Sequence, residues 1–320
     1  MAAQYNLKSV ILGIEAVRGT SPAATAFYKL PISGEIGLHV ESNSGSNNLL
    51  GDTRLANEEY LTTRTVSGNI PISADYSNIY FPLALAMGVP LAATPAGLLY
   101  TRVFTPQNCV PTASVQRTIS PLCGAGADFV ELFKGVAIDG WSINIQDEKL
   151  QVPMVAKGGT VTDSNDGGFT PITVASAKTL TDIDIRKTHS VLTMGGSSYR
   201  LSSQFSLQIG NNVKEEWYIG DGDFPSGLDF GFFTMSGSIA GVFDATFLAT
   251  AKSSGRVDFE IIYTSTVDPL TNLTLTLTNV FIKYKTDPFK VGEKATLSFD
   301  WVADVHSTVS VSLTNKVAVY

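Results

Sequence analysis

The segment 28–41 alternates apolar and polar residues over most of its length, which predicts a β-strand with two different faces. Strands in ordinary domains run about 5 or 6 residues, so this one is unusually long. A long strand with one polar face suits an extended wall. Its apolar positions are Tyr28, Leu30, Ile32, Ile36, Leu38 and Val40.

A second segment, 199–210, alternates in the same way, and both segments begin with Tyr, a basic residue and Leu. A Ser-Gly pair follows each at a similar distance, since Gly68 lies 40 positions after Tyr28 and Gly237 lies 38 after Tyr199. We interpret this repeat as an internal duplication. It predicts a first β-domain with an N-terminal arm at 1–160, a linker at 161–196 and a second β-domain at 197–320.

Each copy is predicted to form a long hairpin around a polar loop. In the first copy, 62–72 returns against 28–41, and the loop is 42–60. The counterpart loop of the second copy is 211–231. Loops of this length are uncommon in compact domains unless they have a function. The residues 1–27 are predicted to be an arm that is free to reach a neighbouring molecule.

A short helix is predicted at 75–88, where Ile79, Leu83 and Met87 have helical spacing and Gly88 can end it. Pro82 is expected to shorten or kink this helix. The segment 243–251 stands at the corresponding place in the second copy.

Further strands are predicted in both copies, at 98–105, 135–145, 150–156, 273–284 and 295–303. Pro153 favours an edge position for the third of these. The distance from Gly68 to Trp141 is 73 positions, whereas Gly237 to Val280 is 43, so the first copy is expected to carry an insertion of 30 within 89–127.

The composition agrees with β-structure and excludes some partners. Hydrophobic residues make up 44% of the 320 and charged residues only 16%. The net charge of −7 argues against a protein that holds nucleic acid by its phosphates. The apolar run at 10–14 is too short for a signal peptide or a membrane span, so we expect synthesis in a cytoplasm. Cys109 and Cys123 would then be reduced, and their spacing matches no metal motif.

Catalytic signatures are missing from the sequence. His39, His189 and His306 lie far apart, and neither a nucleophile elbow nor a phosphate-binding loop occurs. The acidic stretch at 221–229 could suggest calcium, but a turn is the better interpretation. Trp141 and Trp301 fall within strand patterns, which favours core positions over a sugar site. We therefore predict no catalytic residue, no cofactor and no metal.

The chain resembles the tail tube (major tail) proteins of long-tailed bacteriophages. The most similar parts are GIEAVRGTSPAATAFYKLPI, the stretch from TVSGNIPI to ALAMG, and YTRVFTPQNCVPTASVQRTI with GVAIDGWSINI after it. The resemblance covers most of the chain and implies an all-β fold with minor α, as two tandem β-sandwich tube domains. Each domain would have a long lumen-lining hairpin and a short flanking helix.

In that family, the polar face of the hairpins lines the lumen, and the long loops reach an adjacent ring. The lumen candidates in this sequence are Glu35, His39, Glu41, Thr65, Ser67, Asn69, Gln204, Gln208, Thr234, Ser236 and Ser238. The inter-ring candidates are Asn47, Asn48, Asp52, Arg54, Glu58, Asn211, Asn212, Glu215, Asp221 and Asp223. These assignments depend on strand parity, and a slip of one residue would exchange the two faces.

The resemblance also implies partners and a place in the virion. Single-domain members form rings of six, so a chain with two copies would form a trimer with pseudo-sixfold symmetry, or alternatively a hexamer. Stacked rings would make a channel for double-stranded DNA, assembled in the host cytoplasm without a membrane. Other tail proteins, such as the terminator, tape measure and distal tail proteins, would be partners.

Two other functional hypotheses remain open from the residues alone. A bacterial surface or fimbria-like β-sandwich binding protein would need a secretion signal, which the sequence lacks. A carbohydrate-active enzyme would need two close carboxylates, and no pair is distinguished. The polar strand faces could also be ordinary solvent-exposed faces.

Overall fold

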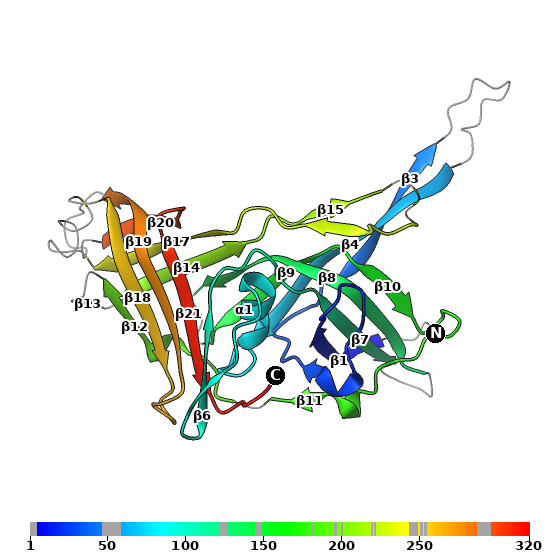
Figure 1. Cartoon of the computed structure of the whole chain (residues 1–320), viewed down its shortest axis with the longest axis horizontal. Coiled ribbons are helices and arrows are strands. Elements are labelled where there is room, and N and C mark those ends of the chain that lie inside the picture. The colour runs from blue at the N-terminus through cyan, green and yellow to red at the C-terminus, as the bar shows by residue number, and fades with distance from the viewer. Residues whose placement is uncertain are drawn as a thin grey trace.

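Figure 1 shows a computed structural model of the chain. It describes residues 5–46, 59–121, 127–144, 149–180, 182–194, 197–199, 201–218, 220, 222–242, 249, 252, 255–286 and 296–320. Within these residues the secondary structure is mostly strand, and the helical elements include α1 (Tyr80–Met87) and three 3-10 turns, at Ala24–Ala26, Val174–Ser176 and Lys187–His189. The predicted all-β class with minor α is confirmed.

One antiparallel sheet of eight strands runs through both halves of the chain, and we call it the eight-strand sheet. Its order is β3, β4, β9, β8, β14, β17, β20 and β19. The pairing of β8 with β14 joins the two halves. The bounds are β3 His39–Ser46, β4 Glu59–Ser73, β9 Gln151–Lys157, β8 Phe129–Asn144, β14 Leu201–Gly210, β17 Thr234–Val242, β20 Thr296–Ala303 and β19 Asn272–Thr286.

The remaining strands form two outer layers and a ribbon. The first layer contains β1 (Tyr5–Ile14), β2 (Tyr28–Lys29), β7 (Ala113–Pro121), β10 (Thr160–Asp163) and β11 (Lys178–Thr179). The second contains β5 (Thr94–Ala96), β6 (Leu99–Phe104), β12 (Ser190–Met194), β13 (Ser197–Tyr199), β18 (Arg256–Thr264) and β21 (Thr308–Asn315). A two-stranded ribbon is made by β15 (Lys214–Glu216) and β16 (Gly227–Asp229).

The long strands β8 and β19 each belong to two layers. The first part of β8 pairs with β7 and β10, and its second part with β9 and β14. The first part of β19 pairs with β18 and β21, and its second part with β20. A residue with positive φ lies near each crossing, Gly135 at 69° and Asn279 at 57°. Gly and Asn adopt this left-handed conformation at the lowest cost, so they suit the turn between layers.

The two halves share one pairing pattern. The strands β3, β4, β9, β8, β7 and β10 pair with one another as β14, β17, β20, β19, β18 and β21 do. The match extends to β1 on β7 and β12 on β18. Strands that occupy equivalent places also follow the same order along the chain.

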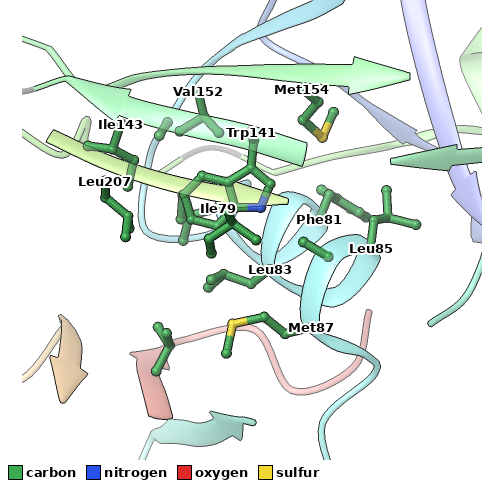
Figure 2. Close-up of a cluster of buried hydrophobic side chains, with 14 of the residues drawn as sticks. Ile79, Phe81, Leu83, Leu85, Met87, Trp141, Ile143, Val152, Met154 and Leu207 are labelled. Carbon is green, nitrogen blue, oxygen red and sulfur yellow. The ribbon is translucent and has the colours of Figure 1, made fainter. Parts of the chain in front are cut away.

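The main hydrophobic core is one cluster that contains residues of both halves. The helix α1 lies inside it, and all eight of its residues are buried. Figure 2 shows Trp141, Ile143 and Leu207 gathered near Ile79 and Leu83. The Trp141 indole N–H donates to the Pro82 carbonyl over 2.9 Å. The helix therefore connects to the eight-strand sheet at the point where its two halves meet.

The predicted helix ends as expected and begins later. Gly88 has φ of 105° and its N–H donates to the Ala84 carbonyl over 3.0 Å, which stops the helix. Before it, the Asp75 carboxylate accepts the N–H groups of Ser77 and Asn78 and holds a turn. Pro82 stands in the first turn of α1, where its missing N–H costs little. The counterpart segment 243–251 lies almost entirely outside the described residues.

The predicted single strand at 28–41 is wrong, although its two-sided pattern is right. The chain leaves β2 at Lys29 and enters β3 at His39. Between them, Ser33 donates its N–H to the Pro71 carbonyl, and Pro31 accepts the N–H of Ser73. Pro31 itself has no N–H to give to a ladder, which interrupts the strand. Leu30, Ile36 and Leu38 are nevertheless buried.

Several further expectations need correction. The segment 5–14 is no free arm, because β1 pairs with β7 and β2. The region 89–127 is not all insertion, because β7 is an integral strand that pairs with β1 and β8. The strand β9 is internal, and its ladder with β8 stops at Met154, one residue from Pro153.

The other predicted strands are confirmed with shifted ends. The segment 98–105 is β6, 135–145 is part of β8, 273–284 is part of β19 and 295–303 is β20. The bounds of the predicted loop 42–60 are wrong at both ends, because β3 extends to Ser46 and β4 begins at Glu59, and residues 47–58 lie outside the described ones.

Candidate functional site

The eight-strand sheet has one apolar and one polar face, and the polar face is the candidate site. Alternate residues of the central strands are buried, such as Ile209 and Trp301, each at 1% exposure. On the opposite face of the second hairpin, Gln208 stands across from Ser236 and Ser206 from Ser238. The Ser206 and Ser238 hydroxyls lie 2.8 Å apart. Small hydroxyl and amide groups therefore dominate this part of the face.

The first hairpin continues the same face with more charge. His39 stands across from Ser67, and Glu41 across from Thr65. The His39 Nε2 and Glu41 Oε1 atoms lie 3.1 Å apart, and both side chains are exposed. The pKa of His39 is raised, first by its hydrogen bond to the Gly37 carbonyl and then by Glu41.

The structure brings most of the predicted lumen residues together on this face. Across the join between the halves, Gln208 stands opposite Ser142 of β8, which makes the two hairpins parts of one surface. Glu35 is exposed but precedes β3 and lies outside any strand. The Gln204 backbone pairs with Ala240, and its side chain lies outside the described ones. That the face lines a lumen stays a prediction.

Residues of β8, β9, β20 and β19 also belong to this face and were missed in the sequence. Their pairings carry the face from Ser67 to Lys157 and from Ser238 through Asp300 to Lys283. Their alternation was a weak signal in the sequence, because Val155 and Val302 are apolar residues at polar parity. These two are 43% and 39% exposed. The residues added to the face are Ser142, Val155, Lys157, Lys283, Asp300 and Val302.

A hollow of about 500 Å³ lies over the pairing of β8 with β14. Most of its lining groups are hydroxyls, amides and a carboxylate. They include Asn69, Asp139, Ser142, Gln208, Asn212 and Ser236. The hollow spans both halves, so the face is concave where they meet.

The loop between β14 and β17 crosses the first half of the same chain. Figure 1 shows the ribbon of β15 running from the second half toward the β3–β4 hairpin. The Asn211 amide donates to the Ile138 carbonyl over 2.9 Å, and the Val213 N–H donates to the Asp139 carboxylate over 2.6 Å. At the far end, the Arg64 N–H donates to the Asp223 carbonyl over 2.5 Å.

Predicted inter-ring residues therefore occupy a defined intrachain contact. Asn211, Asn212, Glu215 and Asp223 lie in this loop, and burial raises the pKa of Glu215. The Arg18 guanidinium donates to the carbonyls of Pro225 and Ser226 nearby. Whether the loop also touches another ring stays a prediction. The remaining inter-ring candidates, Asn47, Asn48, Asp52, Arg54, Glu58 and Asp221, lie outside the described residues.

The described part of the chain holds no group of three His, Cys, Asp or Glu side chains placed to bind a metal. Asp223, from the acidic stretch that could suggest calcium, lies 3.8 Å from Arg64 in an ion pair. Trp141 and Trp301 are buried, as predicted for core residues. None of the described helices is long and apolar enough to cross a membrane.

These features define a class of protein: an all-β protein with a wide, polar, concave sheet, in which β3 and the last part of β19 have an open edge among the described residues. A family model described as phage tail tube protein matches residues 6–311, so the chain belongs to the phage tail tube protein family. It is a structural protein of the phage tail and hence of the virion. No curated protein matches the chain.

Proposed function

We propose that three copies of this chain form a ring, and that stacked rings form the channel through which the phage genome passes. Each half of the chain would occupy one of six places in the ring. The observation that supports this most is the pairing of β8 with β14, which joins two sets of four strands with the same internal order. A duplicated domain explains that repeated order most simply.

The ring accounts for the two open ends of the eight-strand sheet. Open strand edges expose unpaired N–H and C=O groups and invite aggregation, and closure into a barrel removes them. Three chains with the strands β3, β4, β9, β8, β14, β17, β20 and β19 would supply about 24 strands. Porins with 16 to 18 strands already leave an aqueous channel, so the proposed barrel would be wider.

The polar face suits a channel that DNA passes without binding. Its charges are mixed, with Glu41 and Asp300 against Lys157 and Lys283, and the rest are mostly hydroxyls and amides. The Lys157 ammonium already donates to the Val213 carbonyl over 2.9 Å. Strong binding to DNA requires several free cations that replace counterions at phosphates. A wall of this composition would hold DNA weakly.

Tube function also requires other components. We propose assembly in the host cytoplasm, with the tape measure protein inside the growing tube and the terminator and distal tail proteins at its ends. The ribbon of β15 and β16 and the segment predicted as a loop at 42–60 are the proposed contacts between stacked rings.

A labelling experiment tests whether the polar face becomes the lumen. In a Cys109→Ser, Cys123→Ser background, Ser236→Cys places a thiol on the polar face, and Val103→Cys places a matched thiol on the outer sheet, where Val103 is 52% exposed. A maleimide carrying a large polymer should label both thiols in the soluble chain. In tubes seen by electron microscopy, it should label only position 103. Equal labelling of both positions in tubes, or no tube under any condition, would overturn the proposal.

A further inference from the structure

We infer that neighbouring chains of the ring are joined by one specific pairing of strands. The outer edge of β3 in one protomer pairs antiparallel with the end of β19 in the next. In this register, Glu41 stands opposite Lys283, Val40 opposite Tyr284 and His39 opposite Lys285 of the neighbouring protomer. The inference rests on the proposed ring and adds which edges meet and in which register.

The template for this joint lies inside the chain. The strands β14 and β8 pair antiparallel, with Gln208 opposite Ser142, Ile209 opposite Trp141 and Gly210 opposite Gly140. Because β14 corresponds to β3 and β8 corresponds to β19, the pairing inside the chain is the model for a pairing between chains.

Two glycines fix the correspondence between β14 and β3. A Cβ atom on Gly237 would lie 2.0 Å from the Ser206 carbonyl oxygen, and one on Gly68 would lie 2.1 Å from that of Gly37. Both hairpins therefore have the same close approach at the same place. Gly37 takes the place of Ser206. Counting along the strands, His39 takes the place of Gln208 and Glu41 that of Gly210.

The partners of β9 and β20 fix the correspondence between β8 and β19. Ala156 stands across from Gly68 on one side and Ile138 on the other, just as Trp301 stands between Gly237 and Ile282. The next pairs are Gly140 with Val155 and Lys283 with Asp300. Lys283 is therefore structurally equivalent to Gly140, and Lys285 is equivalent to Ser142.

Both edges are open where the joint requires it. Among the described residues, β3 pairs only with β4, and the segment 283–286 pairs only with β20. Immediately before this segment, the same edge of β19 has a partner, because the Ile282 N–H donates to the Gly255 carbonyl over 3.0 Å. Val40 is half-buried in the single chain, whereas Ile209 at the equivalent place is 1% exposed. A second chain on β3 would complete that burial.

Charge distinguishes the proposed joint from its template. Glu41 and Lys283 are exposed on the polar face, and glycines hold both equivalent places inside the chain. Opposite charges across an antiparallel pair attract, and like charges repel. The pair would therefore favour β3 on β19 and disfavour pairing of β3 with a second β3.

Disulfide trapping tests the register. In a Cys109→Ser, Cys123→Ser background, Glu41→Cys with Lys283→Cys should cross-link assembled chains to covalent trimers on oxidation. The matched control, Glu41→Cys with Phe281→Cys, moves one thiol by two residues on the same face, where Phe281 is 39% exposed. It should cross-link at least tenfold less. Tubes in which only the control pair cross-links, or neither pair does, would overturn the register and leave the proposed ring intact.

Charge reversal gives a second readout. Glu41→Lys should abolish ring formation, and Glu41→Lys with Lys283→Glu should restore it. Thermal unfolding of the unassembled chains separates assembly from folding, because position 41 is exposed and its replacement should leave Tm unchanged. Normal tubes from Glu41→Lys alone would contradict the inference. If neither the unmodified chain nor any variant forms rings, the proposed function itself fails and takes this joint with it.

Discussion

The two long hairpins differ in what covers them. The β14–β17 hairpin has β8 on one side and β20 on the other, whereas the β3–β4 hairpin has β9 on one side and, among the described residues, an open edge on the other. The same hairpin is thus closed within the chain in one half and open in the other half. The pairing of β14 with β8 therefore shows, inside one chain, the kind of contact that we propose for β3 with β19 of a neighbouring chain.

The largest effect is expected from proline at two equivalent hairpin positions, Val40 at the open edge and Ile209 inside the sheet. Gly37 donates its N–H to the Asn69 carbonyl, so by alternation the Val40 N–H faces the open edge. The Ile209 N–H at the equivalent place faces β8. Ile209→Pro should cost roughly 2–5 kcal/mol in unfolding free energy, because it removes a ladder bond inside a sheet and shortens a fully buried apolar side chain. Chemical denaturation of the unassembled chain measures this loss.

Val40→Pro should destabilise the chain much less than Ile209→Pro, because an outward N–H on an edge strand has no bond to lose and the Val40 side chain is only half-buried. It should nevertheless block ring formation, and Val40→Thr, which keeps the N–H, should not. Equal destabilisation by proline at 40 and 209 would mean that the two edges do not differ as described.

Alanine at the two hairpin glycines should destabilise both halves alike. Gly68→Ala and Gly237→Ala each place a Cβ within about 2 Å of a backbone carbonyl oxygen, and Gly68 also has φ of 140°. We expect losses of about 2–4 kcal/mol in unfolding free energy for each. Gly222→Ala is the control, because nothing lies within 4 Å of its added Cβ. If either hairpin glycine tolerated alanine as well as Gly222 does, the shared close approach would be disproved.

Substitution of two buried tryptophans compares the place where the halves meet with another part of the sheet. Trp141 donates to the Pro82 carbonyl, whereas Trp301 Nε1 has no partner among the described residues. Replacement by Phe shortens both rings, but only Trp141→Phe also breaks a hydrogen bond. It should cost about 1 kcal/mol more than Trp301→Phe. A larger loss for Trp301→Phe in urea denaturation would argue against the anchoring of α1 at this joint.

The smallest effect is expected in the pH dependence of stability, through His189, which contacts Tyr76 of the first half. The ring is buried beside Tyr76, with Nδ1 3.3 Å from the Tyr76 hydroxyl, and burial followed by Arg186 lowers the pKa of His189. The unfolded chain therefore takes up a proton near pH 6.5, before the folded chain does. The contribution of His189 to the free energy of unfolding should therefore fall as pH falls from 7.5 to 5.5.

We expect the change from pH 7.5 to pH 5.5 to lower Tm by about 1–3 °C more in the unmodified chain than in His189→Gln. The Arg256 guanidinium holds the pKa of Asp304 well below its usual range, so that carboxylate does not titrate in this window. An identical fall in both chains would exclude His189 as the cause.

Local patterns predicted the fold class, α1, the hairpins and the parity of their faces, because each follows from residues close in sequence. The strand β7 escaped prediction because its inward positions include polar residues. Ser114 donates to the buried Glu15 carboxylate, and Gln116 bonds the Ile172 backbone. Such strands lack an apolar alternation, and only tertiary partners make their burial possible.

The polar face was predicted only in part for a similar reason. The hairpin residues were found from alternation, but the join of β8 to β14 brings together segments far apart in sequence. No local signal specifies that Ser142 stands opposite Gln208. The interrupted strand at 28–41 was missed because alternation outweighed Pro31, which has no N–H for a ladder.

We propose that one chain fills two of the six places in a tube ring. Cryo-electron microscopy of assembled tubes, with chains traced around one ring, tests it directly. We expect three chains per ring, with β3 of each chain pairing with β19 of the next. Six chains per ring, or a ring in which these two edges stay apart, would contradict it.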